Sequence, residues 1–337
     1  METLDILKNL SSLCGISGAE QTKNEYLQKI LKEYTPYSYS DALGNCIAKI
    51  KGNGKKQIML EAHLDTVGLI VTGIDEKSGF LRVDKCGGAD ERIMSAQRVK
   101  VFGKRVIDGV IPSTPPHLGG ESNKKTGKIS VDCGLPYEEI REIVSYGDRI
   151  EITNDFFTLK NGTVSGTFLD NNAGIAAIIK ALDLLKDKEL PCDLSVVFAT
   201  REETGKQGAE TACFSLAPDE AVVLDVTFSA APGVVTDICT GKGVAIGASP
   251  ILQKEMTSAL CTLADKIGVP YSVEVMGRGT HTDADVITVS GKGVKTGLIS
   301  IPLKNMHTPV EIAAISDIEL TAKMLEAFVL QGGIINA

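Results

Sequence analysis

The stretch LSVVFATREETG, residues 194–205, joins an apolar run to two adjacent glutamates. Its first half is rich in β-branched and aromatic residues, which indicates a buried strand. Glu202 and Glu203 follow the apolar run directly and precede Gly205. Neighbouring carboxylates in a desolvated place repel each other and lose hydration, so they need compensating positive charge. The stretch therefore predicts both a strand of the fold and a charged site at its carboxyl end.

Apolar runs of this kind alternate with amphipathic stretches along much of the chain. We expect helices over residues 3–13, 19–33, 170–186, 253–268 and 316–330, and strands over residues 45–51, 57–62, 194–200, 220–226, 271–276 and 295–303. Strands that alternate with helices are typical of a parallel sheet with helices on both faces. The fold predicted from this pattern is α/β, a mixed sheet with a parallel core sandwiched by helices.

The pattern changes between about residues 73 and 161. Short alternating runs such as GFLRVDKC and RVKVFG are separated there by Gly, Pro and Asn, which indicates a β-rich module with few helices. The 337 residues also exceed the size at which one hydrophobic core stops growing. We therefore expect one domain of residues 1–72 plus 162–337, interrupted by an inserted domain of residues 73–161.

Composition excludes several classes of protein. A net charge of −8 and a pI near 5.2 argue against a nucleic-acid partner held by phosphate contacts. The sequence shows neither a signal peptide nor an apolar run long enough for a membrane span. The eight cysteines are scattered and form no C-x-x-C pair. We therefore expect reduced thiols in a cytoplasmic protein with no membrane partner.

Ionisable residues follow five of the apolar runs, at the strand ends where open α/β sheets bind their ligands. These residues are His63 with Asp65, Asp170, Glu202 with Glu203, Asp225, and His307. Each has an ordinary explanation when taken alone: an aspartate can cap a helix or form a turn, and the glutamates can lie in a solvated loop. Taken together, they would crowd negative charge into one crevice. Divalent cations are the simplest way to remove that repulsion.

The residue types narrow the choice of metal and the chemistry. Histidine and carboxylate ligands without cysteine suit Zn²⁺, Co²⁺ or Mn²⁺ better than Ca²⁺. A two-metal hydrolytic site needs one bridging carboxylate and one carboxylate outside the ligand set to act as general base. Adjacent Glu202 and Glu203 can divide these tasks, one as a metal ligand and the other as the base.

Eight motifs occur in an order that resembles metallopeptidase family 42, the glutamyl, lysyl and deblocking aminopeptidases that form tetrahedral particles. They are CGISGAE, AHLDTVGLIV, GVIPSTPPH, GTFLDNNAG, EETGKQGAE, VVLDVT, THTDADVI and ISIPLKNMHTPVE. They span nearly the whole chain. His-x-Asp alone is common, whereas the ordered set is specific.

The resemblance implies an aminopeptidase that removes N-terminal residues from short peptides. It implies two divalent metal ions in the α/β domain, zinc or cobalt, with manganese as the alternative. It also implies that the insert is a small β-barrel or PDZ-like dimerisation domain, and that dimers assemble into a homo-oligomeric, tetrahedral dodecamer.

Carried over by position, the resemblance assigns a role to each candidate. Asp170 would bridge both metals, with His63 and Asp225 completing one site and Glu203 and His307 the other. Glu202 would be the general base, and Asp65 would orient the His63 imidazole. His117 would either reach a neighbouring subunit's site or lie in a surface loop. His281 would line the pocket or serve a structural purpose rather than bind metal.

The chain departs from the family pattern at two places. Asn171 and Asn172 stand where the family has a second Asp followed by Arg, which leaves the ligand set intact. Lys304 and Asn305 replace the usual Arg-Tyr before Met-His, so the substrate preference stays open.

Three other functions share some of these features. A carboxypeptidase or N-deacylase of the related two-metal fold would need an arginine for the substrate carboxylate, and only Arg201 and Arg278 stand near the motifs. A glycosidase needs paired carboxyls and usually aromatic sugar platforms, but the chain has no Trp and 5% aromatic residues. A non-enzymatic, metal-stabilised assembly would not need the spare carboxylate.

Overall fold

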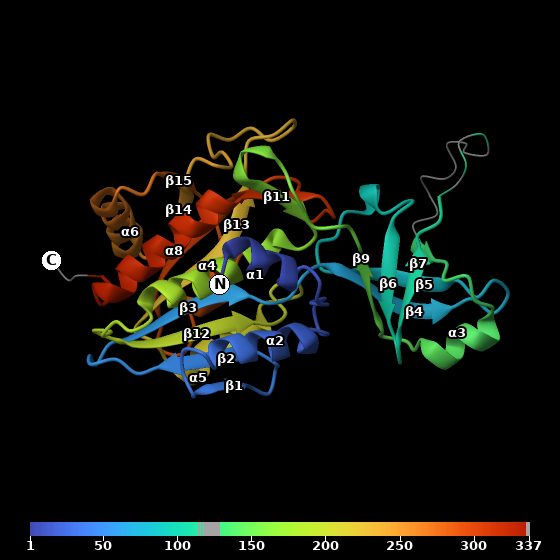
Figure 1. Cartoon of the computed structure of the whole chain (residues 1–337), viewed down its shortest axis with the longest axis horizontal. Helices are drawn as coiled ribbons and strands as arrows, with labels where there is room; N and C mark the ends of the chain where they lie inside the picture. Colours follow the sequence, from blue (N-terminus) through green and yellow to red (C-terminus); the bar gives the residue numbers. More distant parts are fainter. Residues whose placement is uncertain (114, 116, 118–128, 335–337) are drawn as a thin grey trace.

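An eight-stranded mixed sheet forms the centre of the larger lobe of the computed structural model, which describes residues 1–113, 115, 117 and 129–334 (Figure 1). Its strands, in spatial order, are β1 (Ser38–Ser40), β2 (Cys46–Ile50), β12 (Asp193–Ala199), β3 (Gln57–His63), β13 (Glu220–Phe228), β16 (Lys295–Leu303), β14 (Val244–Ala248) and β15 (Tyr271–Val275). The neighbours β12, β3, β13 and β16 run parallel, and antiparallel pairs flank them. The predicted parallel core is therefore confirmed.

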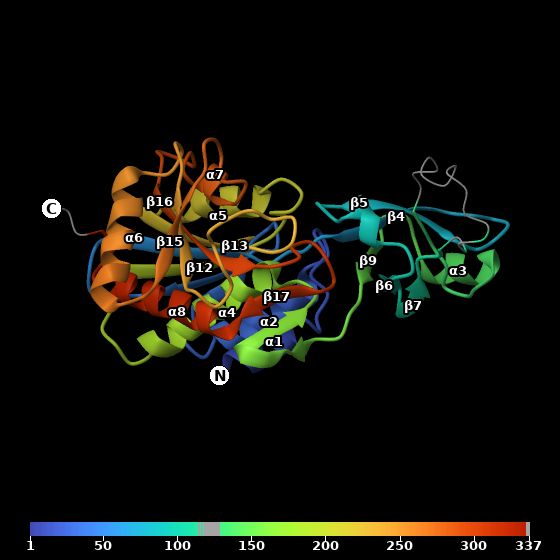
Figure 2. The ribbon, with the colours of Figure 1, turned by 90° about the horizontal axis from the view of Figure 1, so that it is seen from above.

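Helices cover both faces of this sheet (Figure 2). One face packs against α1 (Thr3–Leu10), α2 (Gln21–Leu31), α4 (Leu169–Leu185), α6 (Lys254–Ile267) and α8 (Ile315–Leu330), and the other against α5 (Gln207–Leu216) and α7 (Ala284–Ile287). Successive side chains of β12 enter opposite cores, since Val196 and Phe198 face the first set and Val197 and Ala199 the second. This two-sided burial explains why the run 194–199 is apolar except for Ser195 and shows no regular polar alternation.

A small antiparallel sheet lies beside the main one. It consists of β10 (Phe157–Thr158), β11 (Thr163–Gly166) and β17 (Glu311–Ala314), with the 3₁₀ turn Lys160–Gly162 between the first two. Strand β11 leads into α4, and β17 follows the loop after β16. The pairing of β11 with β17 therefore brings the start of α4 close to that loop.

The smaller lobe is built on a second, antiparallel sheet with its own core (Figures 1 and 2). Its strands, in spatial order, are β7 (Val106–Val110), β6 (Arg98–Phe102), β9 (Arg149–Ile152), β4 (Gly68–Ile74), β5 (Leu81–Cys86) and β8 (Ile129–Val131). The lobe also contains α3 (Tyr137–Ile143) and the 3₁₀ turn Glu91–Ile93. A division between residues 72 and 73 would cut β4 in two, so we propose 68–152 as the inserted domain.

Two further features bear on the expected location. Across the described ranges, every helix is too short or too polar to cross a lipid bilayer. All eight cysteines carry free thiols. The cytoplasmic location itself stays a prediction.

Candidate metal centre

Neighbouring strands of the main sheet deliver most of the candidate residues to one edge. His63 is the last residue of β3, Asp225 lies near the end of β13, Glu203 follows β12, and His307 follows β16. Parallel strands end at a common edge, which brings these side chains together. Asp170 lies at the start of a helix, α4, as predicted, but the strand that precedes it, β11, belongs to the small sheet and not to the main one.

The side chains form two groups that share one residue. His63, Asp170 and Asp225 form the first, and Asp170, Glu203 and His307 form the second; within each group the ligand atoms lie within 4.8 Å of one another. The two oxygens of Asp170 face different histidines: Oδ1 lies 3.0 Å from His63 Nε2, and Oδ2 lies 3.3 Å from His307 Nε2. Asp170 therefore has the geometry of a bridging carboxylate.

Backbone carbonyls orient both imidazoles. His63 Nδ1 lies 3.0 Å from the backbone oxygen of Asp65, and His307 Nδ1 lies 3.1 Å from that of Gly88. Donation from Nδ1 leaves the lone pair of Nε2 available as a ligand for a metal ion. The Asp65 carboxylate lies 3.8 Å from His63 Nδ1, so the expected orienting contact comes from the main chain of Asp65 and not from its side chain.

The Asp65 side chain instead holds the segment with the two glutamates. Its Oδ1 accepts a hydrogen bond from the backbone N–H of Glu202 at 2.8 Å, and its Oδ2 accepts one from Glu203 at 3.2 Å. Asp65 is fully buried. The residue that positions His63 therefore also positions the loop after β12.

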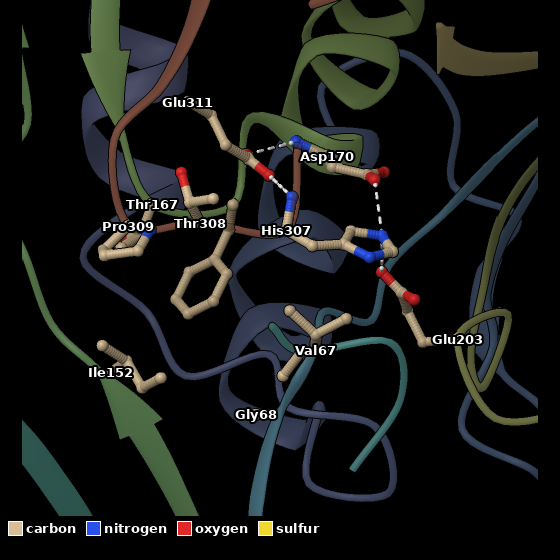
Figure 3. Close-up of a pocket in the computed structure, with 12 residues that line it drawn as sticks. Val67, Gly68, Ile152, Thr167, Asp170, Glu203, His307, Thr308, Pro309 and Glu311 are labelled. Carbon is tan, nitrogen blue, oxygen red and sulfur yellow. Dashed lines mark hydrogen bonds and ion pairs between the residues drawn. The ribbon is translucent and has the colours of Figure 1, made fainter. Parts of the chain in front are cut away.

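Glu311 holds the backbone next to the second ligand group, as Figure 3 shows. Its carboxylate accepts hydrogen bonds from the backbone N–H groups of Asp170, at 3.0 Å, and His307, at 2.8 Å. The side chain is buried at the start of β17. Glu311 was not among the predicted site residues, although it ends the motif that contains His307; its position four residues after this candidate ligand was the available signal.

The electrostatics of the centre favour added cations. Burial raises the pKa of Glu203 well above its ordinary value, and the Asp170 charge adds to the shift. Burial likewise raises the pKa of Asp225, although His63 opposes it. Three buried carboxylates thus compete for the positive charge of two imidazoles. The donors are oxygen and nitrogen atoms without sulfur, a set that fits Zn²⁺, Co²⁺ or Mn²⁺.

Glu202 lies outside both groups but faces the same cavity. Its Oε1 forms an ion pair with Lys206 Nζ at 2.5 Å, and Lys206 also donates to the backbone oxygen of His281 at 2.8 Å. Burial raises the pKa of Glu202, while His63 and Lys206 lower it. Lys206 was not among the predicted site residues, although it stands four residues after Glu202 in the EETGK motif.

Two cavities adjoin the groups. The larger, of about 600 Å³, is lined by residues of both groups and by Glu202 and His281. The smaller is lined by Asp170, Glu203 and His307 and by the apolar residues labelled in Figure 3, Val67, Ile152 and Pro309. His281 therefore lies at the cavity and outside both ligand groups. His117 is exposed on the inserted domain, and its role at a neighbouring site stays a prediction.

The residues that depart from the family pattern contribute to the frame. The Asn171 side chain accepts a hydrogen bond from Gly174 N–H and donates one to Leu224 O, and the Asp170–Asn171 peptide is cis. Asn172 is fully buried. Asn305 donates to the backbone of Val310, and Lys304 pairs its backbone with Ile312. These replacements shape the segments around Asp170 and His307.

Several known proteins are similar to this chain over nearly its whole length. The model of the M42 glutamyl aminopeptidase family matches residues 44–324. The lysyl aminopeptidase of Pyrococcus furiosus is 32% identical and covers 96% of this chain and 95% of its own length. Aminopeptidase APDkam598 of Desulfurococcus kamchatkensis superposes with a TM-score of 0.92 at 30% identity, covering 98% and 95% of the two chains. The TET1 peptidase of Pyrococcus horikoshii, which can assemble into a tetrahedron or a large octahedral shell, superposes with a TM-score of 0.88 at 32% identity. The superposition covers 98% of this chain and 100% of the TET1 chain.

Proposed function

Because the chain belongs to the M42 glutamyl aminopeptidase family, we propose that it removes N-terminal residues from short peptides with two divalent metal ions. The observation that carries the proposal is the position of Asp170, whose two oxygens face the histidines of two separate ligand groups. A single structural ion would not require two such groups with a shared carboxylate.

His63, Asp170 and Asp225 would hold one ion, and Asp170, Glu203 and His307 the other. Zinc or cobalt suits this set of ligands, with manganese as the alternative. When bound, such ions supply Lewis acidity that polarises the scissile carbonyl and acidifies water, and they offer a position for the free α-amino group. Asp65 and Glu311 hold the backbone of four ligand-loop residues, so the centre is fixed before substrate arrives.

Glu202 is the proposed general base. Its carboxylate takes one proton from the attacking water as the water oxygen bonds to the carbonyl carbon. It then delivers that proton to the leaving amine as the carbon–nitrogen bond breaks. The ion pair with Lys206 favours the ionised form of the carboxylate, against the effect of burial, and limits its motion.

The lining of the larger cavity favours an aminopeptidase over a carboxypeptidase or N-deacylase. Those enzymes bind a substrate carboxylate, for which arginine is the usual partner. None of the described residues that line the cavity is an arginine, and its lysine, Lys206, is already paired with Glu202. A free α-amino group needs no arginine, because a bound metal ion would accept its nitrogen lone pair.

We extend the proposal to the assembly. The TET1 relative can assemble into a tetrahedron or a large octahedral shell, and the inserted domain of this chain provides a lobe with its own core for pairing with a second copy. Dimers that build a tetrahedral dodecamer would enclose the sites, so only short peptides would reach them. Sedimentation velocity of the metal-loaded protein tests this directly: a monomer at micromolar concentration would contradict it.

Mass-spectrometric digestion tests the proposed reaction. One short peptide with a free amino terminus and its N-acetylated twin are incubated with metal-stripped protein and with protein reloaded with Zn²⁺ or Co²⁺. The expected result is stepwise loss of N-terminal residues from the free peptide alone, and only after reloading. Loss from the C-terminus, or release of acetate, would contradict the proposal and favour the carboxypeptidase or deacylase.

A further inference from the structure

The larger cavity extends from the metal-ligand groups toward β15, the edge strand of the main sheet. This part of the cavity is lined by Glu274 of β15 and by Met276, two residues further along the chain. Strands β13 and β16 contribute Thr227, Leu298 and Ser300. Its volume of about 600 Å³ exceeds the roughly 20 Å³ open inside the smaller cavity. A long substrate side chain next to the metal centre therefore fits only in the larger of these two cavities.

Glu274 gives this part of the cavity a negative charge. It is half-buried, and its Oε1 accepts a hydrogen bond from Thr227 Oγ1 at 2.5 Å. Within the described part of the chain, no lysine, arginine or histidine lies within ion-pair distance of its carboxylate. Partial burial raises the pKa of Glu274, because water solvates the charge incompletely. A cation that enters the cavity would restore the missing stabilisation.

The other charges of the cavity are already engaged. Glu202 and Lys206 pair with each other at 2.5 Å, and Lys206 also donates to His281 O. The remaining ionisable residues of the lining belong to the two ligand groups, apart from the His281 side chain. The charge that stays free to meet a substrate side chain is therefore that of Glu274.

We propose that Glu274 makes the site select peptides whose N-terminal residue is lysine or arginine. This inference rests on the proposed aminopeptidase function. Met276 and Leu298 present apolar walls on which the methylene stem of such a side chain can pack. The ammonium or guanidinium group then forms a charge-assisted hydrogen bond with Glu274.

The test compares two ligands and three proteins. Binding of lysine hydroxamate and leucine hydroxamate is measured by calorimetry on metal-loaded wild type, Glu274→Gln and the control Glu255→Gln, which removes one exposed carboxylate of α6. Hydrolysis of lysyl, leucyl and glutamyl p-nitroanilides is measured on the same samples. The amide introduced by Glu274→Gln keeps the shape of the side chain and loses its charge, so we expect lysine affinity and lysyl kcat/KM to fall roughly 10- to 100-fold. For Glu274→Gln, the affinity for leucine hydroxamate and the leucyl kcat/KM should change less than about twofold. For Glu255→Gln, all measured affinities and kcat/KM values should also change less than about twofold.

The outcomes separate the two proposals. Glu274-dependent binding of lysine hydroxamate without hydrolysis of any anilide would support the inference and contradict the proposed function. Hydrolysis with leucyl or glutamyl substrates preferred, or with a lysyl preference that survives Glu274→Gln, would overturn the inference alone. Glu274→Lys, which reverses the charge, is a second test of the inference. It should lower kcat/KM for the lysyl anilide and raise kcat/KM for the glutamyl anilide. Retained hydrolysis of the leucyl anilide shows that this variant is folded.

Discussion

The backbone N–H of Glu202 donates a hydrogen bond of 2.8 Å to the carboxylate of Asp65. The bond joins the loop after β12 to the end of β3, where the main chain of Asp65 also orients His63. One buried residue thus sets the relative position of a metal ligand and the proposed base. The contact gives the carboxylate two residues after His63 a structural role, although it lies 3.8 Å from the imidazole Nδ1.

Replacing Asp65 with Asn should impair catalysis without unfolding the protein. The amide keeps one acceptor oxygen but turns an NH₂ group toward a backbone N–H, so one of the two bonds to Glu202 and Glu203 is lost. We expect kcat to fall roughly 10- to 100-fold. Steady-state hydrolysis together with the melting temperature checks this; an unchanged kcat would show that the loop is held by other contacts.

Glu311→Gln should act mainly on metal binding. The carboxylate accepts from the N–H groups of Asp170 and His307, and an amide can satisfy only one of them with its oxygen. We expect the affinity for Zn²⁺ or Co²⁺ to fall roughly 10- to 100-fold. Titration of the stripped protein measures this. Wild-type affinity in the variant would assign Glu311 to stability alone.

Gly88→Ala should disturb the His307 side of the site selectively. A Cβ at this position would lie 2.8 Å from His307 Nδ1, too close for a real contact. The ring must move, which weakens the group that contains Glu203 and leaves His63 and Asp225 unaffected. The expected result is one retained and one weakened ion per subunit. Gly277→Ala is the matched control, because no atom lies within 4 Å of the position that its Cβ would take; equal metal content in both variants would contradict the selective effect.

The fully buried Glu61 should make stability depend on pH. Burial raises its pKa to about 8 in the folded protein, compared with an ordinary value of 4.5. The folded state therefore binds this proton more tightly than the unfolded state does. The contribution of protonated Glu61 to the free energy of unfolding is fully present below about pH 4.5 and is lost as the pH rises through about 8.

Urea denaturation of metal-free protein between pH 5 and 9 measures this contribution. Glu61→Gln should lose less stability than wild type as the pH rises across that range, because the amide does not titrate. Parallel curves for the two proteins would contradict the assignment.

Local patterns in the sequence predict six of the eight strands of the main sheet and bring the candidate ligands to one edge of it, whereas β1 and β14 were missed. Apolar runs such as 194–199 predict strands, and the polar residues after them predict the edge where ligands meet. Glu311 and Lys206 were not predicted, since their function depends on partners brought by the loops after β11 and β12. The assignment of the strand before Asp170 to the small sheet was missed because the pairing of β11 with β17 is a long-range contact.

Metal content per subunit, measured by mass spectrometry in parallel with peptide hydrolysis, tests the central claim most directly. Glu202→Gln should keep two ions and lose turnover by roughly 10²- to 10⁴-fold, because a base is removed and no ligand is touched. Asp170→Asn should lose both ions, since the groups on either side depend on its two oxygens. Full turnover in Glu202→Gln, or two ions retained in Asp170→Asn, would contradict a bridged two-metal site with Glu202 as its base.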